Sequence, residues 1–586
     1  MRAAFIVLAV VAVLSVSLRA DAGAASAQAT LAWRACGGGF ECSTLTVPLD
    51  YGLPAGRTVD LALIRKPAAQ PAQRIGSLVT DPGGPGGSGV QFARAWAGSL
   101  ATEITDRFDI VGFDPRGVGA SSPVVCHDSL QAYIAADPSP DSQPEWDQLV
   151  KVNKDFADAC AQKYGDFLQH LGTKDVARDL ERIRIALGEP KLTYLGYSYG
   201  TAIGQAYLDQ FPMNVRAIVL DGAVTLAGDV DGRGLDQSRG FEKAMDAFIA
   251  DCITINCPLT KYGDPAKAVS DVIAKAEAAP MPSKTADRPA GPGEVLYGLI
   301  EPLYSKGRWF ELARAVDAGL SGDGSRLVEL TDDYLGRNGN GYDNQTETNV
   351  AVNCIDQAAS KLPTEYKDYP PVAAEYAKAS PRFGSSLATG LTCKFWPAKP
   401  DPLGPVTATG MPPIVVVSTT GDPATPYAWG VAVSKQIPGA VLLTFGGEGH
   451  TAYGGRNQCI DAAVNAYLIN LKTPPPNTVC GDPALLPPAA DEPAPTPSPS
   501  TSATPNGTAS PSPTPRPSGT PTIRPTPRPT RPTTPAAPSS GSTGGDGFRF
   551  PWFWATTVVI GLAFAGGGTL IALRRIAADR PPPRME

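Results

Sequence analysis

The strongest constraint on the fold is a series of short apolar runs, rich in β-branched residues, that recur between long helical patterns. The runs lie at 45–49, 59–64, 76–80, 108–113, 192–195, 215–220, 414–418 and 441–445. From the third run onward, most are bounded by Gly, Pro or Asp and followed by helical periodicity, as at 175–187. Strands that alternate with helices in this way form a mostly parallel sheet flanked by helices. We therefore predict an α/β fold.

The stretch 223–405 interrupts this alternation, because its periodicity is almost entirely helical. Helical patterns cover 241–253, 266–278, 294–303 and 309–320. Strand-and-turn patterns resume after 405, which favours a helical cap inserted between two strands of one sheet over an independent domain. We expect the first part of the core at 30–222, the cap at 223–405 and the C-terminal part of the core at 406–485.

Both ends of the chain carry apolar segments outside this body. Residues 1–29 combine one positive charge near the start, a short apolar run and Ala-x-Ala exits, which is typical of a signal peptide; a membrane anchor is the weaker alternative because the run is short. Residues 551–573 are long enough to cross a bilayer, and Arg574 and Arg575 follow them. The positive-inside rule then places the tail 574–586 in the cytoplasm and the body outside. A buried core helix is the alternative for 551–573.

Residues 486–547 consist mostly of Pro, Thr, Ser, Ala and Gly. This composition cannot bury enough apolar surface to fold, and proline favours extended polyproline II segments of ~3.1 Å per residue. We expect a disordered stalk that holds the body away from a bacterial membrane, at the cell surface. Cell-wall polymer is a candidate partner along its length.

Charge and cysteine usage exclude other classes of function. The net charge is −7 and the basic residues are scattered, so no nucleic-acid partner is indicated. Ten Cys in an exported chain are most simply disulfides, and with three His and no paired Cys-x-x-Cys we expect neither a metal nor a cofactor. Proximity in sequence suggests the pairs Cys36–Cys42, Cys126–Cys160, Cys252–Cys257, Cys354–Cys393 and Cys459–Cys480.

The sequence Gly196-Tyr197-Ser198-Tyr199-Gly200 lies between a predicted strand and a predicted helix. Flanking glycines permit a tight turn that exposes the serine hydroxyl, and the helix N-terminus favours developing negative charge. We therefore predict Ser198 as a nucleophile. A structural serine in a tight turn is the alternative.

A nucleophilic serine on such a turn needs a base, and the usual chain order is Ser, acid, His. His450 alone among the three His follows Ser198, in a Gly-rich loop after an apolar run. Asp422 comes just after the predicted strand 414–418 and would hold the imidazole. Glu448 is the competing acid, but two residues from His450 it is poorly placed to reach the far ring nitrogen. We predict a triad of Ser198, Asp422 and His450.

A glycine-rich loop at 81–89 follows the predicted strand 76–80. This is where backbone N–H donors for an oxyanion are expected, and we predict Gly84 N–H and Tyr199 N–H as the two donors. A phosphate-binding loop is rejected because no Gly-Lys-Ser/Thr follows the glycines.

Five short sequences in this order carry a family resemblance. They are Gly-Gly-Pro-Gly-Gly at 83–87, Phe-Asp-Pro-Arg-Gly-Val-Gly-Ala-Ser at 113–121, the sequence around Ser198, Gly-Asp-Pro-Ala-Thr-Pro at 421–426 and Gly-His at 449–450. Together they resemble the secreted bacterial tripeptidyl/prolyl aminopeptidases, over about 40–482 and including a TAP-like C-terminal segment. The resemblance implies an α/β-hydrolase fold, a cap that closes the site, and cleavage of short peptides from a free N-terminus. Pro82 stands where related prolyl iminopeptidases carry a His, which leaves a preference for proline unsupported.

The resemblance also implies an acid in the cap that binds the substrate amine. The cap offers Glu301, Asp332, Asp333 and Asp356. We choose Asp356, which a neighbouring disulfide would hold rigid, with Glu301 as the second candidate. A solvated surface acid is the alternative for each.

The residues predict an exported, membrane-anchored serine hydrolase that works through an acyl-enzyme. The resemblance implies that it is an aminopeptidase, which releases short peptides of tripeptidyl type from free N-termini. A carboxylesterase or lipase with the same triad is the nearest alternative, with an ester in place of the peptide substrate. A non-catalytic surface binding module is a remote third, which the complete triad disfavours.

Overall fold

The computed structural model describes residues 31–339, 341–357, 360, 362–387 and 390–486. The predicted signal peptide, the predicted stalk from 487 onward, the predicted span 551–573 and the tail 574–586 lie outside these residues. Within the described residues, no helix has both the length and the hydropathy that crossing a membrane requires.

The described chain contains one large sheet of ten strands, in the order β1-β2-β3-β5-β4-β6-β7-β10-β11-β12. Strands β5 to β12 of this order pair in parallel, while β1, β2, β3 and β5 pair antiparallel at one edge. The strand bounds are Arg34–Ala35 (β1), Glu41–Pro48 (β2), Thr58–Lys66 (β3), Gly76–Asp81 (β4), Phe108–Phe113 (β5), Leu192–Tyr197 (β6), Val215–Asp221 (β7), Val415–Gly421 (β10), Val441–Glu448 (β11) and Thr478–Gly481 (β12). The predicted mostly parallel sheet is confirmed, and the structure adds the short edge strands β1 and β12.

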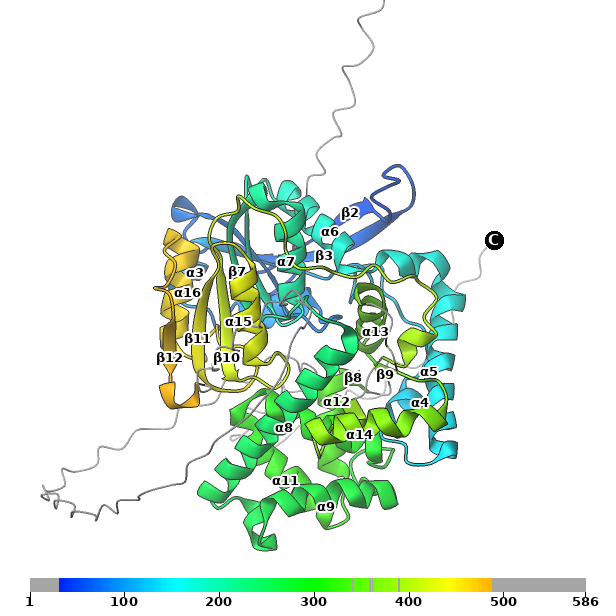
Figure 1. The fold of residues 1–586 in the computed structure, drawn as a ribbon. Helices are drawn as coiled ribbons and strands as arrows, with labels where there is room; N and C mark the ends of the chain where they lie inside the picture. Colours follow the sequence, from blue (N-terminus) through cyan, green and yellow to red (C-terminus); the bar gives the residue numbers. More distant parts are fainter. Residues whose placement is uncertain (1–30, 340, 358–359, 361, 388–389, 487–586) are drawn as a thin grey trace, which may run out of the picture.

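Helices cover both faces of this sheet, because successive residues of a strand point to opposite faces. Val415 and Val417 pack with α2, α3 and α16, whereas Val416 packs with α6, α7 and α15. Every residue of β4, β5, β6 and β10 is buried, as expected for parallel strands that helices cover on both sides. Figure 1 shows these two helical layers. Their bounds are Gly89–Trp96 (α2), Thr102–Thr105 (α3), Thr173–Ala186 (α6), Gly200–Gln210 (α7), Tyr427–Gln436 (α15) and Gln458–Asn470 (α16).

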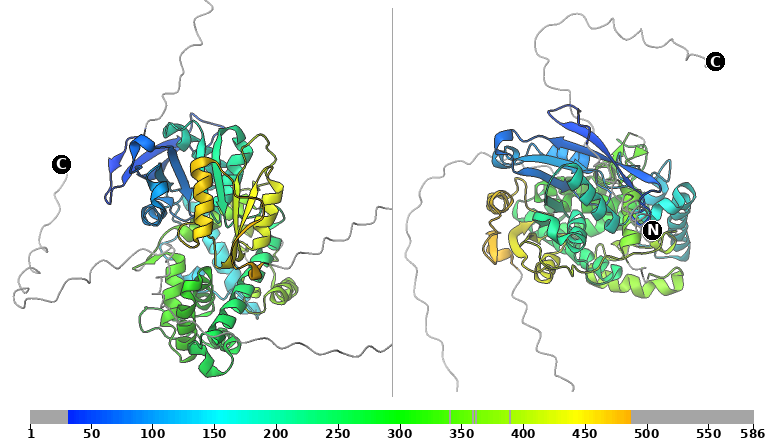
Figure 2. Two further views of the ribbon diagram at one scale, coloured as in Figure 1. Left: turned by 90° about the vertical axis from the view of Figure 1, so that its left-hand side faces the viewer. Right: turned by 90° about the horizontal axis from the view of Figure 1, so that it is seen from above.

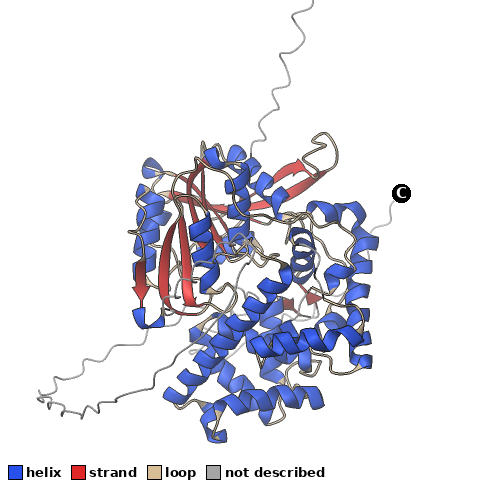
Figure 3. Cartoon of the chain, viewed as in Figure 1, coloured by secondary structure: helices blue, strands red, loops and turns tan. Residues whose placement is uncertain are grey.

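A helical cap lies in the chain between β7 and β10 and forms a separate layer beside the sheet (Figures 1 and 2). Its helices are Val230–Thr254 (α8), Pro265–Ala278 (α9), Pro292–Ile300 (α10), Trp309–Leu320 (α11), Ser325–Leu335 (α12), Gln345–Asp356 (α13) and Tyr369–Ala379 (α14), with a 3-10 turn at Glu301–Tyr304 (η5). Figure 3 shows that this layer is almost wholly helical apart from the short strands Arg337–Asn338 (β8) and Gly341–Tyr342 (β9). Helices α8 to α12 bury an apolar core of their own.

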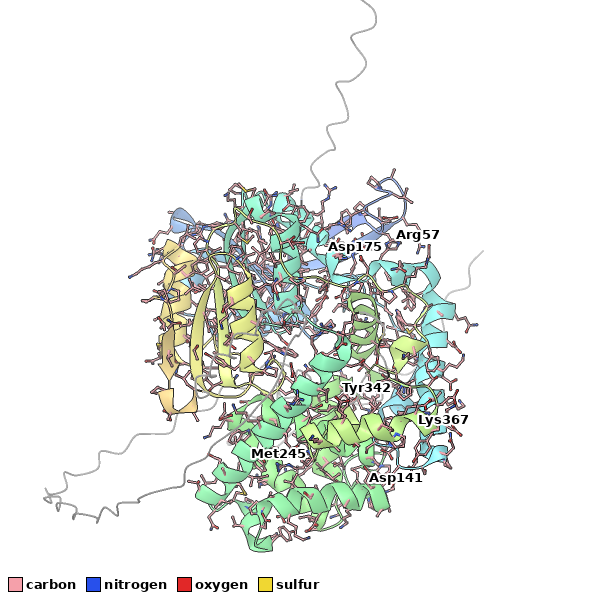
Figure 4. The ribbon with its side chains drawn as sticks, viewed as in Figure 1. Arg57, Asp141, Asp175, Met245, Tyr342 and Lys367 are labelled. Atoms are coloured by element: carbon pink, nitrogen blue, oxygen red, sulfur yellow. A yellow bond between two sulfur atoms is a disulfide. The ribbon has the colours of Figure 1, made fainter. Side chains whose placement is uncertain are left out.

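Two further helices from between β5 and β6 join the cap, at Gln131–Ile134 (α4) and Gln143–Tyr164 (α5). The Gln131 side chain donates to Glu294 of α10 at 2.8 Å, and the Trp146 indole donates to the carbonyl of Thr364 at 3.1 Å. In Figure 4, Asp141 before α5 lies in the same corner as Lys367, while Arg57 and Asp175 mark the sheet-containing part. The cap is therefore built from two separate stretches of the chain, 131–164 and 230–379.

Five disulfides connect all ten cysteines, in the pairs predicted from proximity. Cys354–Cys393 joins the end of α13 to the turn that follows α14, and Cys459–Cys480 joins α16 to β12. Cross-links of this kind stabilise a fold mainly by restricting the unfolded chain.

Candidate active site

Ser198 lies on the turn between β6 and α7, with a φ of 52° that non-glycine residues rarely adopt. Its N–H donates to the Asp221 carbonyl at 2.9 Å, which fixes the turn to the end of β7. A Cβ atom at Gly196 would lie 2.3 Å from the carbonyl oxygen of Gly200, so this pair approaches too closely for any side chain. The strained turn presents the serine at the carboxyl end of the parallel strands.

Asp422 and His450 follow the neighbouring parallel strands β10 and β11, which bring them together. His450 Nδ1 lies 2.9 Å from both carboxylate oxygens of Asp422. The carboxylate also accepts hydrogen bonds from the N–H groups of Ala424 at 3.0 Å and Thr425 at 2.8 Å. These bonds hold its position independently of the imidazole. Among the described residues, no hydrogen bond joins Glu448 to His450.

The His450 ring is buried at the base of the cap. Its backbone N–H donates to the Tyr304 carbonyl at 2.9 Å, and the two rings meet edge to face at a centroid distance of 5.3 Å. Its Nε2 has no hydrogen-bond partner in the part of the chain that the structure describes. A Cβ atom at Gly222 would lie 3.2 Å from His450 Cε1, so the ring lies against the same end of β7 that holds the Ser198 turn. His450 Nε2 is therefore the ring nitrogen that can accept the proton of a nucleophilic hydroxyl.

The glycine-rich loop after β4 packs directly on the nucleophile turn. A Cβ atom at Gly83 would lie 2.8 Å from the Tyr199 nitrogen and 3.0 Å from Ser198 Cβ. The Asp81 carboxyl accepts the Gly83 N–H at 2.9 Å, and its complete burial raises its pKa to about 8. Across the described residues, neither the Gly84 N–H nor the Tyr199 N–H donates a hydrogen bond to the protein. Two backbone donors are thus available beside the serine.

A cavity of about 910 Å³ lies between these loops and the cap. Ser198, Tyr199 and Gly84 line it from the sheet side. Helices α4, α5, α8, α10 and α13 line it from the cap side. Its volume lies within the roughly 300–1,000 Å³ range of small-ligand sites.

One end of the cavity is acidic. Glu301, Glu311 and Asp333 all line it and surround a single guanidinium, that of Arg308. Glu301 pairs with Arg308 through Oε1, while its buried Oε2 has no hydrogen-bond partner among the described residues. Burial raises the pKa of Glu301 to about 8. A cation placed here would favour the ionised form of this carboxyl.

Asp356 does not line the cavity. Its carboxylate accepts the Thr173 N–H at 2.8 Å and the Thr173 hydroxyl at 2.5 Å, and burial raises its pKa to about 7. The Thr173 hydroxyl also bonds the Tyr199 hydroxyl, so Asp356 supports the residue after the nucleophile from within the protein. Asp332 pairs with Arg288. Of the acids that the sequence offered, Glu301 and Asp333 are the two that face the cavity.

Comparison with known proteins identifies the family. The model described as alpha/beta hydrolase fold matches residues 77–260, and the model described as TAP-like protein matches residues 380–480. The chain is 41% identical to "Serine protease Hip1" of Mycobacterium tuberculosis over 461 residues, which cover 76% of this chain and 88% of that protein. The chain belongs to the TAP-like α/β-hydrolases. It is accordingly a serine hydrolase.

Two further relatives of this TAP-like hydrolase have different names. "Carboxylesterase B" of M. tuberculosis is 39% identical over 467 residues, which cover 75% of this chain and 86% of that protein. "Tripeptidyl aminopeptidase" of Streptomyces lividans is 33% identical over 479 residues, which cover 79% of this chain and 88% of that protein.

The cap of this TAP-like hydrolase contacts three of the four loops that carry the candidate site, namely the glycine-rich loop, the Asp422 loop and the His450 loop. Asn349 of α13 donates to the Pro85 carbonyl at 3.1 Å, and Gln237 of α8 donates to the Ala424 carbonyl at 2.8 Å. Tyr304 of η5 accepts from His450, as described above. Sequence reasoning missed Asn349 and Gln237, because an isolated amide within a helical pattern carries no signal for a distant contact.

Proposed function

We propose that this serine hydrolase is an aminopeptidase that releases short peptides, of tripeptidyl type, from free N-termini. The observation that carries the proposal is the acidic end of the cavity, where three carboxylates meet one guanidinium. A peptide α-amine has a pKa of about 8 and is largely protonated at neutral pH. It would bind the unpaired Oε2 of Glu301 by a charge-assisted hydrogen bond. The relative named "Tripeptidyl aminopeptidase" supports the same activity.

We assign the first chemical step to Ser198 and His450. Ser198 Oγ attacks the scissile carbonyl carbon while His450 Nε2 takes its proton, and Asp422 stabilises the imidazolium that forms. The carbonyl electrons move onto oxygen, which the N–H groups of Gly84 and Tyr199 would bind. Collapse of this intermediate breaks the peptide bond, and His450 gives its proton to the leaving amine.

The second step releases the N-terminal fragment. Water attacks the Ser198 ester, and His450 again accepts the proton and then returns it to the serine oxygen. The acids at the acidic end of the cavity would stay bound to the fragment's amine until the ester is cleaved. The position of the amine site relative to Ser198 would therefore set the length of the released peptide.

A carboxylesterase is the second candidate function, and the relative named "Carboxylesterase B" favours it. The same nucleophile, base and oxyanion donors hydrolyse esters, which need no protonated leaving amine. An esterase has no use for the acidic end of the cavity, and this difference separates the two candidates.

Three substrates test the proposal: a tripeptide anilide with a free amine, its N-acetylated form and a p-nitrophenyl ester. We expect the free anilide to be cleaved at least about tenfold more efficiently than the acetylated one, since acetylation removes the charged group. Glu301→Gln should raise KM for the free anilide and leave ester hydrolysis nearly unchanged. Glu329→Gln, on the exposed face of α12, is the matched control. Equal cleavage of free and acetylated peptide would refute the aminopeptidase.

We further propose that the catalytic body works outside the cell and is anchored by 551–573. The five disulfides support an oxidising compartment, because such bonds are rare in the cytosol. A fluorophosphonate that cannot cross membranes should label Ser198 on intact cells, and the label should be lost in Ser198→Ala. Labelling that appears only after lysis would contradict the proposed location, and labelling of the variant would contradict the nucleophile.

A further inference from the structure

Helix α8 presents one face to the cavity along several turns. Val230, Arg233, Gly234, Gln237 and Phe241 line the cavity, and their spacing places them on one side of the helix. Phe241 packs against Tyr304 at a ring-centroid distance of 5.8 Å, so this part of α8 lies beside η5, to which Glu301 belongs. Arg233 precedes Phe241 by two turns, or about 12 Å of helix at ~1.5 Å per residue. The cavity therefore has a cation on its wall well removed from the Phe241 end.

Arg233 differs from its neighbouring arginines in having no paired carboxylate. Its guanidinium donates to the Gly228 carbonyl at 3.2 Å, and no carboxylate of the described residues lies within ion-pair distance. By contrast, Arg308 contacts three carboxylates, and Arg239 on the other side of α8 pairs with Asp236 at 2.9 Å.

The environment of Arg233 favours an incoming anion. Its side chain is partly buried, and loss of hydration lowers its pKa, while Asp229 and Asp356 act on it only at longer range. A partly desolvated guanidinium without a counter-ion gains from a carboxylate, which it binds through two parallel hydrogen bonds. The structure thus offers a prepared carboxylate site inside the same cavity as Ser198.

We propose that Arg233 binds the C-terminal carboxylate of a short free peptide, on the leaving-group side of Ser198. This inference rests on the proposed aminopeptidase, in which the amine occupies the acidic end near Glu301. An extended peptide spans ~3.3–3.6 Å per residue, so about four residues would cover a length comparable with the 12 Å between the Arg233 and Phe241 turns of α8. The substrate class is a zwitterionic oligopeptide of about four residues, recognised at both of its charged termini.

The test compares two tetrapeptides that differ only at the C-terminus, one with a free carboxylate and one with an amide. For the wild-type enzyme, kcat/KM for the free acid should exceed that for the amide by about 10- to 100-fold, mainly through KM. Arg233→Gln should remove this preference, whereas Arg233→Lys should keep part of it. Arg239→Gln is the matched control and should keep all of it.

The tripeptide anilide has no carboxylate and reports separately on folding and on the proposed function. Arg233→Gln should cleave it at the wild-type rate. If wild type cleaves the anilide but does not distinguish acid from amide, or if Arg233→Gln slows both tetrapeptides equally, the Arg233 site is refuted while the aminopeptidase stands. If wild type cleaves no unblocked peptide, the proposed function itself fails. An amidated tetrapeptide ending in Glu that is cleaved as well as the free acid would refute recognition of the C-terminus. Should Arg233→Gln fail to fold, the wild-type comparison alone decides.

Discussion

Asp422 accepts more hydrogen bonds than one imidazole requires. Besides His450 Nδ1, the N–H groups of Ala424, Thr425 and Thr451 and the Thr425 hydroxyl all donate to it. These donors hold the carboxylate in a single orientation. The His450 ring is thereby fixed with Nδ1 toward the acid, and Nε2 is left without a hydrogen-bond partner among the described residues.

Asp422→Asn should therefore separate geometry from charge. The amide keeps the size of the carboxylate but cannot offer two acceptor oxygens to the imidazole. We expect kcat to fall by about 10³- to 10⁴-fold, the scale known for the same change in a serine protease triad, with little change in KM. Steady-state kinetics with the free tripeptide anilide and a melting curve measure this. A loss of less than about tenfold in an intact fold would show that another group orients His450.

At the scale of single elements, α8 has two tasks. It lines the cavity through Arg233 and Phe241, and it supports the acid loop through Gln237 and Gly240. A Cβ atom at Gly240 would lie 2.4 Å from the carbonyl oxygen of Pro423, the residue after Asp422. The helix can approach the acid loop this closely only because a glycine stands there.

Gly240→Ala tests this contact. Alanine favours a helix by up to about 1 kcal/mol over glycine, so α8 itself should not unfold. The added methyl group would instead push the acid loop away, and we expect kcat to fall by about 10- to 100-fold. Kinetics together with circular dichroism measure the two effects. Gly232→Ala, in the first turns of α8, meets only the Asp229 side chain at 3.1 Å and is the control that should keep activity.

The disulfide Cys354–Cys393 acts on a second such element, α13. It fixes the end of a helix whose Asn349 donates to the Pro85 carbonyl, in the loop that carries Gly84, one of the two predicted oxyanion donors. Replacing both cysteines with serine should lower the free energy of unfolding by about 2–4 kcal/mol. Thermal melting measures the loss, and KM for the tripeptide anilide should rise with it. The control replaces Cys36 and Cys42, which lie at the β1–β2 edge of the sheet, with serine. This double variant should leave KM unchanged.

The elements predictable from sequence are those that carry a local pattern. The apolar runs that became β4, β6 and β10 were visible because parallel strands are buried on both faces, and the run that became β11 is partly buried. Ser198, Asp422 and His450 could be picked because each ends or follows such a strand. In contrast, α4 and α5 joined the cap through contacts with α10 and a distant loop, which no local pattern encodes.

The choice between Asp356 and Glu301 shows the same limit at one position. Both are buried acids in the cap, and proximity to Cys354 drew the prediction toward Asp356. Which acid faces the cavity depends on what packs against it. Thr173 forms two hydrogen bonds with the Asp356 carboxylate, whereas Glu301, on η5, lines the cavity. Sequence alone does not specify that packing.

At the scale of the whole molecule, several buried acids have raised pKa values. Burial raises the pKa of Asp81 and Glu301 to about 8 and that of Asp221 and Asp356 to about 7. Between a pH of about 4 and the raised pKa, each of these carboxyl groups is protonated in the folded protein but ionised in the unfolded chain. Their stabilising contribution is full below the unfolded value near 4 and is lost as the pH rises through the folded value.

Asp81→Asn should reduce the loss of folding stability as the pH rises. The amide keeps the acceptor for the Gly83 N–H but cannot ionise. The difference in Tm between the variant and the wild type should therefore widen, in favour of the variant, as the pH rises from about 5 to about 9. Melting curves across this range measure it. A constant difference would show that Asp81 is already ionised in the folded protein at pH 5, so that burial does not raise its pKa.

The three cap contacts, from α8, α13 and η5, also bear on how a peptide enters. Because each contact ends on a different loop of the catalytic machinery, a cap that swung aside would displace the acid, the base and the Gly84 donor together. The open cap would then admit a substrate but could not cleave it, and the closed cap could cleave a substrate but not admit one. Such coupling would spare folded proteins, whose chains could never be enclosed, and would restrict hydrolysis to substrates small enough to fit beneath the closed cap.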